Sequence, residues 1–110
     1  MKQKDIYLAN MNPTMGSEQS GKRPVVIISG NTLNTNLNIK IVCPISSKVK
    51  NQRVTVCIEK NKKNNLDKDS VVLPFQVRSV SNSRLINKIG EISDNELILI
   101  LKKLNESLLY

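Results

Sequence analysis

Short apolar runs rich in β-branched residues recur along this chain, and polar, asparagine-rich segments separate them. Runs of this length and composition are typical of β-strands, because helices need longer periodic patterns. The expected strands lie at residues 5–10, 24–29, 39–45, 53–59, 70–75, 76–80 and 85–92. One longer periodic segment follows them. The pattern therefore predicts a mostly β, antiparallel barrel or half-barrel with one terminal α-helix packed on it.

The terminal helix has a recognisable start. Ser93-Asp94-Asn95-Glu96 is a capping box, in which the serine and glutamate side chains bond to each other's backbone amides. An apolar stripe then continues to about residue 108, and we expect it to pack against the core. The stripe consists of Leu97, Ile100, Leu101, Leu104 and Leu108. Further apolar residues, Ile98, Leu99 and Leu109, exceed the stripe, so part of the helix could also meet a partner.

Other segments give simpler predictions. Residues 30–38 are rich in asparagine and threonine with little apolar pattern, so we expect a flexible connection. Pro44 should lie at a strand end or a bulge. Val54, Val56 and Ile58 alternate with polar residues and should share one buried face. The two cysteines, at positions 43 and 57, lie in apolar runs, which favours buried reduced thiols over a disulfide or a metal site.

Length and composition indicate one domain spanning residues 1–110. A chain of 110 residues with 39% hydrophobic content can bury a modest core, which an oligomer interface would help to stabilise. The first apolar run is too short for a signal peptide or a membrane span. We therefore expect a cytoplasmic protein without membrane association.

The formal net charge of +8 favours an anionic partner, with nucleic acid as the first candidate, although a solvated basic surface is the alternative. Aromatic residues are too few for recognition by extensive base stacking. The positive charge concentrates in the middle of the chain, at Lys40, Lys48, Lys50, Arg53, Lys60, Lys62, Lys63 and Lys68.

Residues 16–24 form the stretch most suggestive of chemistry. Glycines at positions 16 and 21 permit positive φ angles, and Pro24 biases Arg23 toward an extended backbone. A guanidinium held beside Glu18 and Gln19 would suit a phosphate ester. The alternative is a long hairpin loop with ordinary surface charges.

Several blocks of this sequence match a known pattern in order. The most specific is residues 16–27, and Asp5-Ile6-Tyr7-Leu8-Ala9, Cys43-Pro44-Ile45-Ser46-Ser47 and residues 66–80 support it. Together they resemble the MazF/PemK family of toxin endoribonucleases from type II toxin–antitoxin modules. The resemblance implies an SH3-like barrel of the CcdB/MazF/PemK type and a homodimer. It also implies metal-independent cleavage of single-stranded RNA (mRNA) at a short sequence without a cofactor, and a cognate acidic antitoxin as inhibitor. Contact with DNA would be indirect, through the antitoxin.

The resemblance also implies roles for individual residues. Arg23, Ser46 and Glu18 match the family's catalytic arginine, threonine and loop glutamate, and the general base stays open between Glu18 and Arg23. The expected RNA-binding residues are Gln19, Lys22, Ser47, Lys48, Lys50, Arg53, Gln76 and Arg78. Ser46 departs from the usual threonine by losing a methyl group that restricts its rotamers. Phe75 replaces an acidic residue common in the family, so it either stacks on a base or belongs to the core.

Two rival functions remain open from the sequence. A gyrase poison like CcdB would share the fold, but that relative acts through a tryptophan near its C-terminus, and this chain has no tryptophan. A non-catalytic RNA-binding barrel would retain the basic surface without the cleavage chemistry.

Overall fold

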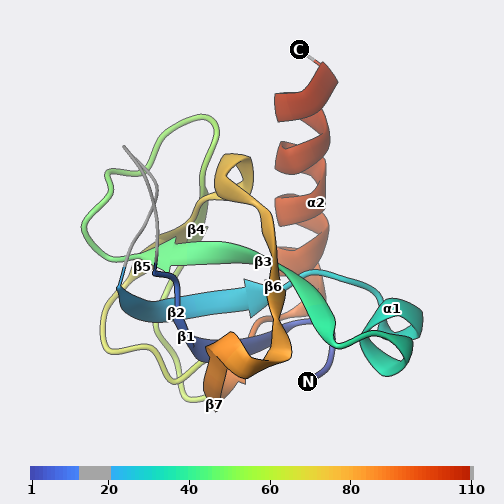
Figure 1. The fold of residues 1–110 in the computed structure, drawn as a ribbon. Coiled ribbons are helices and arrows are strands. Elements are labelled where there is room, and N and C mark those ends of the chain that lie inside the picture. The colour runs from blue at the N-terminus through green and yellow to red at the C-terminus, as the bar shows by residue number, and fades with distance from the viewer. Residues whose placement is uncertain (13–20, 110) are drawn as a thin grey trace.

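The computed structural model describes residues 1–12 and 21–109, which form an antiparallel sheet with a long helix beside it (Figure 1). The strands are β1 (Asp5–Asn10), β2 (Lys22–Ile27), β3 (Ile39–Ser46), β4 (Val56–Ile58), β5 (Ser70–Val72), β6 (Arg78–Ser81) and β7 (Leu85–Glu91). The helices are α1 (Asn31–Asn36) and α2 (Asp94–Leu109), with short 3₁₀ turns η1 (Pro74–Gln76) and η2 (Asn82–Arg84). The predicted mostly β class with a terminal helix is confirmed.

Strand β3 organises the sheet, whose order is β4-β5-β3-β2-β1-β7 with β6 also paired to β3. One edge of β3 pairs with β2, while the other pairs with β6 up to Val42 and with β5 from Ile45 onward. Pro44 lies inside β3, opposite Val25 and in the gap between those two partners, rather than at the predicted strand end or bulge. The sheet is not closed, but its curvature gives the barrel-like fold expected for this class.

The core lies on both sides of the central strands. Val26 and Ile28 face a cluster that also contains Leu97 and Ile100 of α2. The alternate residue Val25 faces a second cluster built around Met11 and Val80. Both faces of β2 are therefore covered, which explains its continuous apolar sequence.

The capping box of α2 is confirmed. The Ser93 amide donates to Glu96 Oε1 at 2.8 Å, and the Glu96 amide donates to Ser93 Oγ at 3.1 Å. The predicted stripe is only partly correct, because Leu97 and Ile100 are buried whereas Leu108 is 75% exposed. Figure 1 shows the reason: the C-terminal half of α2 extends past the sheet. Leu101 is likewise exposed. No helix in the described residues is long and apolar enough to cross a membrane.

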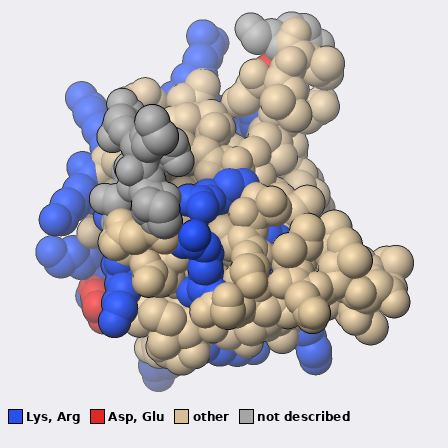
Figure 2. All heavy atoms as spheres, in the orientation of Figure 1, with Lys and Arg blue, Asp and Glu red and all other residues tan. Residues whose placement is uncertain are grey.

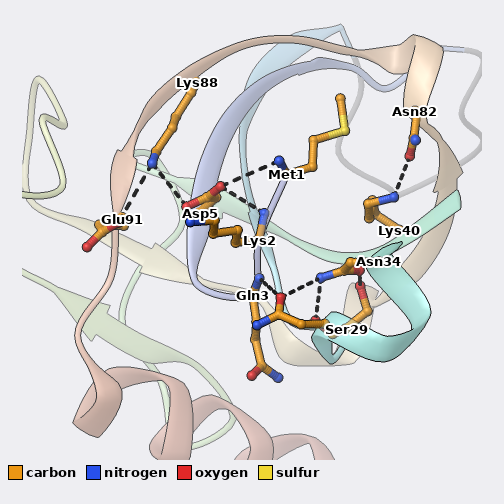
Figure 3. Close-up of polar contacts among 11 residues, drawn as sticks. Met1, Lys2, Gln3, Asp5, Ser29, Asn34, Lys40, Asn82, Lys88 and Glu91 are labelled. Carbon is orange, nitrogen blue, oxygen red and sulfur yellow. Dashed lines mark hydrogen bonds and ion pairs between the residues drawn. The ribbon is translucent and has the colours of Figure 1, made fainter. Parts of the chain in front are cut away.

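The expectation of a flexible connection at residues 30–38 is wrong, because this segment contains α1. The Asn34 side chain donates to the Ser29 carbonyl at 2.8 Å, and the Gln3 amide donates to Asn31 Oδ1 at 3.0 Å (Figure 3). The side chain of Gln3 also donates to the Ile28 carbonyl. The Asn31 side chain therefore attaches α1 to the N-terminal segment, and the Asn34 side chain attaches it to the end of the preceding segment.

Lys40 does not belong to the basic surface, because its residue is only 1% exposed. Its ammonium group donates to the carbonyls of Leu37 and Ile39 and to Asn82 Oδ1 at 2.9 Å (Figure 3). Three neutral acceptors thus satisfy the three ammonium protons. The predicted contribution of Lys40 to the surface charge is therefore wrong.

Two predictions for the region around β4 also need correction. Val56 and Ile58 are buried as predicted, but Val54 precedes the strand and is 41% exposed. Both cysteines are free thiols, yet only Cys43 is buried, and burial raises the pKa of its thiol to about 12. Cys57 faces outward because it alternates with Val56 and Ile58 along the strand.

The connection between β4 and β5 packs closely against β7. Asn64 is fully buried, accepts hydrogen bonds from the amides of Asn61 and Leu66, and donates to the Glu59 carbonyl. A Cβ at Gly90 of β7 would lie 2.5 Å from the Asn64 carbonyl oxygen. Only glycine therefore allows the two backbones to approach this closely.

Replacing Gly90 by alanine should destabilise the fold by about 1–3 kcal/mol, because the backbone of the connection must move. Gly30→Ala is the matched control, since nothing lies within 4 Å of a Cβ there. Its effect should stay within about 0.5 kcal/mol. Urea unfolding of both variants measures the difference. Equal stabilities would contradict the close contact between this connection and β7.

Candidate active site

The pairing of β2 with β3 brings Arg23 and Ser46 together at adjacent strand ends. The ladder sets Val25 opposite Pro44 and Val26 opposite Cys43, and the same register continued beyond the ladder sets Arg23 opposite Ser46. Both residues line one hollow of about 470 Å³. The structure thus brings together two of the three predicted catalytic residues.

The Ser46 side chain accepts hydrogen bonds from the connection that follows it. Its residue is 4% exposed, and its Oγ accepts hydrogen bonds from the amides of Lys48 and Val49, each at 3.2 Å. A serine oxygen has two lone pairs, so these amides occupy both of them. The hydroxyl proton is what Ser46 can offer to a ligand, and the two accepted bonds polarise the O–H group for that donation.

Arg23 lies at the start of β2, where its backbone is paired with β1. Its backbone lies opposite Ala9 of β1, and the next residue, Pro24, lies opposite Leu8. Gly21 has a φ of +75°, so the predicted positive φ is confirmed at this position. The extended backbone expected for Arg23 is likewise observed, and its side chain is half-buried in the hollow.

Two arginines from later in the chain hold the end of β1 next to Arg23. Arg84 Nη1 donates to the carbonyls of Asn10 and Asn12, and Arg78 Nη1 donates to the Met11 carbonyl at 3.4 Å. The Asn12 side chain in turn accepts a hydrogen bond from the Gly21 amide at 3.0 Å. The sequence pattern carried no signal for this use of Arg84, because its acceptors are more than 70 residues away.

The other predicted site residues fall into three groups. Lys22, Ser47 and Lys48 line the same hollow as Arg23 and Ser46. Lys50 is exposed on the connection that follows β3, while Arg53 lines a second hollow together with Phe75. Gln76 and Arg78 are half-buried in η1 and β6. The predicted roles of Glu18 and Gln19, and the predicted turn at Gly16, lie outside the described residues.

The surface around the hollow is strongly basic. Figure 2 shows Lys and Arg side chains along the left edge of this face, on the side where β2 begins and β3 ends (Figure 1), and a further band at its centre. Lys22, Lys48 and Lys68 line the hollow itself, with Asp67 as the carboxylate among the described lining residues. The described residues contain no group of three or more His, Cys, Asp or Glu side chains that could hold a metal ion.

This arrangement suits a phosphodiester. A guanidinium can donate two parallel hydrogen bonds to phosphate oxygens, and the Ser46 hydroxyl can donate a further one. The surrounding lysines would attract the polyanionic backbone of a nucleic acid.

Comparison with known proteins identifies relatives of this chain. A family model described as PemK-like, MazF-like toxin of type II toxin-antitoxin system matches residues 2–108. The fold is similar to that of MazF from Deinococcus radiodurans, with a TM-score of 0.83 and 24% identity over 98% of this chain and 96% of that one.

The fold is also similar to that of chains in two toxin–antitoxin complexes. MazE-MazF from Deinococcus radiodurans has a TM-score of 0.78 and 25% identity, over 98% of this chain and 95% of that one. An endoribonuclease in complex with its cognate antitoxin, from a mycobacterial species, has a TM-score of 0.80 and 15% identity, over 98% and 94% of the two chains.

Replacing Ser46 by alanine should lower the free energy of unfolding by about 1 kcal/mol, because two backbone amides lose their acceptor. Ser46→Thr should keep most of that stability, since the hydroxyl remains. Ser47→Ala is the matched control at the neighbouring exposed serine and should have little effect. Thermal unfolding measures all three. Equal losses for Ser46→Ala and Ser47→Ala would contradict the role of Ser46 in shaping this connection.

Proposed function

The chain belongs to the PemK-like, MazF-like toxin family of type II toxin–antitoxin systems, and we propose that it is a metal-independent endoribonuclease. Its substrate is single-stranded RNA, cleaved in the cytoplasm at a short sequence. The observation that supports this proposal best is the shared hollow of Arg23 and Ser46, at the end of paired strands.

The reaction proposed here is an intramolecular transfer. The ribose 2′-hydroxyl attacks the adjacent phosphorus and forms a new O–P bond, while the bond from phosphorus to the 5′-oxygen breaks. The products are a 2′,3′-cyclic phosphate and a 5′-hydroxyl, and hydrolysis of the cyclic phosphate gives a 3′-phosphate. The attacking hydroxyl must lose a proton, and the leaving oxygen must gain one.

The described residues supply the electrostatic part of this reaction. Arg23 would donate to the non-bridging oxygens, whose negative charge grows as the phosphorane-like state forms. Ser46 would donate a hydrogen bond from its hydroxyl to the same group, because the amides of Lys48 and Val49 already occupy both lone pairs of its oxygen. These contacts are strongest when the charge has developed, so they lower the barrier more than they tighten substrate binding.

The general base is proposed from the resemblance alone and stays open between Glu18 and Arg23. A glutamate with a raised pKa could take the proton directly, whereas an arginine rarely gives up its own. Histidine is absent from the sequence, so the usual pair of imidazoles has no counterpart.

The partners of this chain follow from its family. We propose a homodimer as the active form and a cognate acidic antitoxin as its inhibitor. The net charge of +8 suits an acidic partner as well as RNA, so the two would compete for the same basic face.

The decisive assay incubates purified protein with a long RNA in EDTA and maps the new ends. We expect 2′,3′-cyclic phosphate and 5′-hydroxyl ends at a short recurring sequence. Arg23→Ala should reduce the cleavage rate about a hundredfold or more, because one preorganised donor is lost. Lys22→Gln is the neighbouring control, and it should weaken RNA binding while largely sparing the rate at saturation.

A folded Arg23→Ala variant that cleaves at the normal rate would contradict the role of this guanidinium. A supercoiling assay run in parallel tests the rival function as a gyrase poison. Intact RNA together with lost gyrase activity would contradict the endoribonuclease proposal and support the gyrase poison instead.

The connection after β3 should position the RNA backbone through Lys48, Lys50 and Arg53. Replacing both lysines by glutamine should flatten the slope of log affinity against log salt by about 1.4, since each phosphate contact to a single strand contributes about 0.7. The control with the same change in net charge replaces Lys60 and Lys62. An equal flattening in both double variants would contradict a localised contact. Fluorescence anisotropy with a 2′-O-methyl oligonucleotide measures the slopes.

A further inference from the structure

A second hollow, of about 970 Å³, is present in addition to the one lined by Arg23 and Ser46. Its walls come from the β3–β4 connection at residues 52–54, from η1, and from the C-terminal half of α2. Figure 1 shows η1 between that connection and α2. The two hollows share no lining residue among those described, so they are separate places on the surface.

Phe75 is the aromatic residue of this second hollow. It is the one phenylalanine in the sequence, and it is 46% exposed although its neighbours Leu73 and Pro74 are buried. The chain turns into η1 at this point, so the apolar run does not continue as a strand. A large ring left open to solvent gives up burial free energy, but it presents a π-face to a ligand.

The rim of the hollow is polar and mainly basic. Arg53 and Lys103 contribute positive charge, Glu106 contributes one carboxylate, and Gln52 and Ser107 contribute neutral hydrogen-bonding groups. Lys103 Nζ donates to the Arg53 carbonyl at 2.6 Å, which joins α2 to the β3–β4 connection. An exposed aromatic ring together with cations and polar groups in one hollow suits a nucleobase and its attached phosphate.

The β3–β4 connection links this hollow to the proposed cleavage site. Its first residues, 47–49, line the hollow of Arg23 and Ser46, and residues 52–54 line the hollow of Phe75. Lys50 is exposed between these two groups. An RNA strand with one phosphate at Arg23 would follow this basic connection and arrive at Phe75.

We propose that the second hollow binds one nucleobase of the RNA substrate by stacking on Phe75. This inference rests on the proposed endoribonuclease function and adds a specificity-determining residue to it. Stacking strength increases with ring size, so Phe75 favours a purine at that one position of the substrate. An apolar side chain of a protein partner is the alternative occupant, and the basic rim and the continuity with the cleavage site favour the nucleobase.

The test digests a randomised RNA pool with the wild-type protein, Phe75→Leu and Phe75→Trp, and sequences the ends. The wild-type protein should prefer a purine at one position near the cleaved bond. Phe75→Leu should lose that preference alone, and Phe75→Trp should keep it. For the best oligonucleotide, kcat/KM should fall about tenfold in Phe75→Leu.

An abasic nucleotide at the preferred position makes the test specific for stacking. It should lower kcat/KM about tenfold for the wild-type protein and leave Phe75→Leu without a further loss, because the same contact is already missing. Circular dichroism confirms that both variants fold, which the exposure of Phe75 leads us to expect.

The outcomes separate this inference from the proposed function. If the wild-type protein cleaves RNA but Phe75→Leu has the same site preference and kcat/KM, only the stacking proposal is wrong. This is the result expected if the hollow binds a protein partner instead of a nucleobase. If the wild-type protein cleaves no RNA in EDTA, the proposed function fails, and the stacking proposal fails with it.

Discussion

The antiparallel pairing of β2 with β3 is the constraint on which the rest of this structure depends. Val25 and Val26 point into different core clusters, so both faces of β2 are buried, and a shift of one residue would exchange those faces. The register is therefore fixed by packing far from the site. Continued two residues beyond the ladder, the same register sets Arg23 opposite Ser46, so the geometry of the candidate active site follows from the core.

Additional contacts prevent the strand ends from separating. Arg84 bonds to the carbonyls of Asn10 and Asn12 at the end of β1, and the backbone of that strand lies opposite Arg23. At the end of β3, Ser46 Oγ accepts hydrogen bonds from two backbone amides of the connection that follows the strand. Preorganised donors of this kind reduce the reorganisation needed when charge develops on a phosphate.

Local patterns predicted the elements that local interactions determine. The capping box at Ser93 depends on neighbouring residues, and the apolar runs of β1 and β3 are visible in the sequence itself, so the sequence identified all three. Long-range contacts decided the remainder. The burial of Lys40 depends on Asn82, and the place of Arg84 depends on carbonyls near residue 11. Exposure of Leu108 follows from the length of α2 beyond the sheet, which no local periodicity encodes.

For the candidate site, the sequence identified Arg23 and Ser46 through a resemblance, and the fold supplied the reason that they meet. The Phe75 hollow could not be predicted, because it forms between three segments that are distant in sequence. The connection after β3 contributes residues to both hollows. Under the proposed function, this one short segment would set the distance from a scissile phosphate to a recognised base, and cleavage and recognition would share one basic surface.

The claim that Arg23 and Ser46 share one site is tested most directly by a double-mutant cycle. The single-turnover cleavage rate is measured for Arg23→Ala, Ser46→Ala and the double variant. If both side chains act on one phosphodiester, each single variant should lose about a hundredfold, and the double variant should lose little more. A double variant that loses the full product of the two, about ten-thousandfold, would show that the residues act independently and would contradict the shared site.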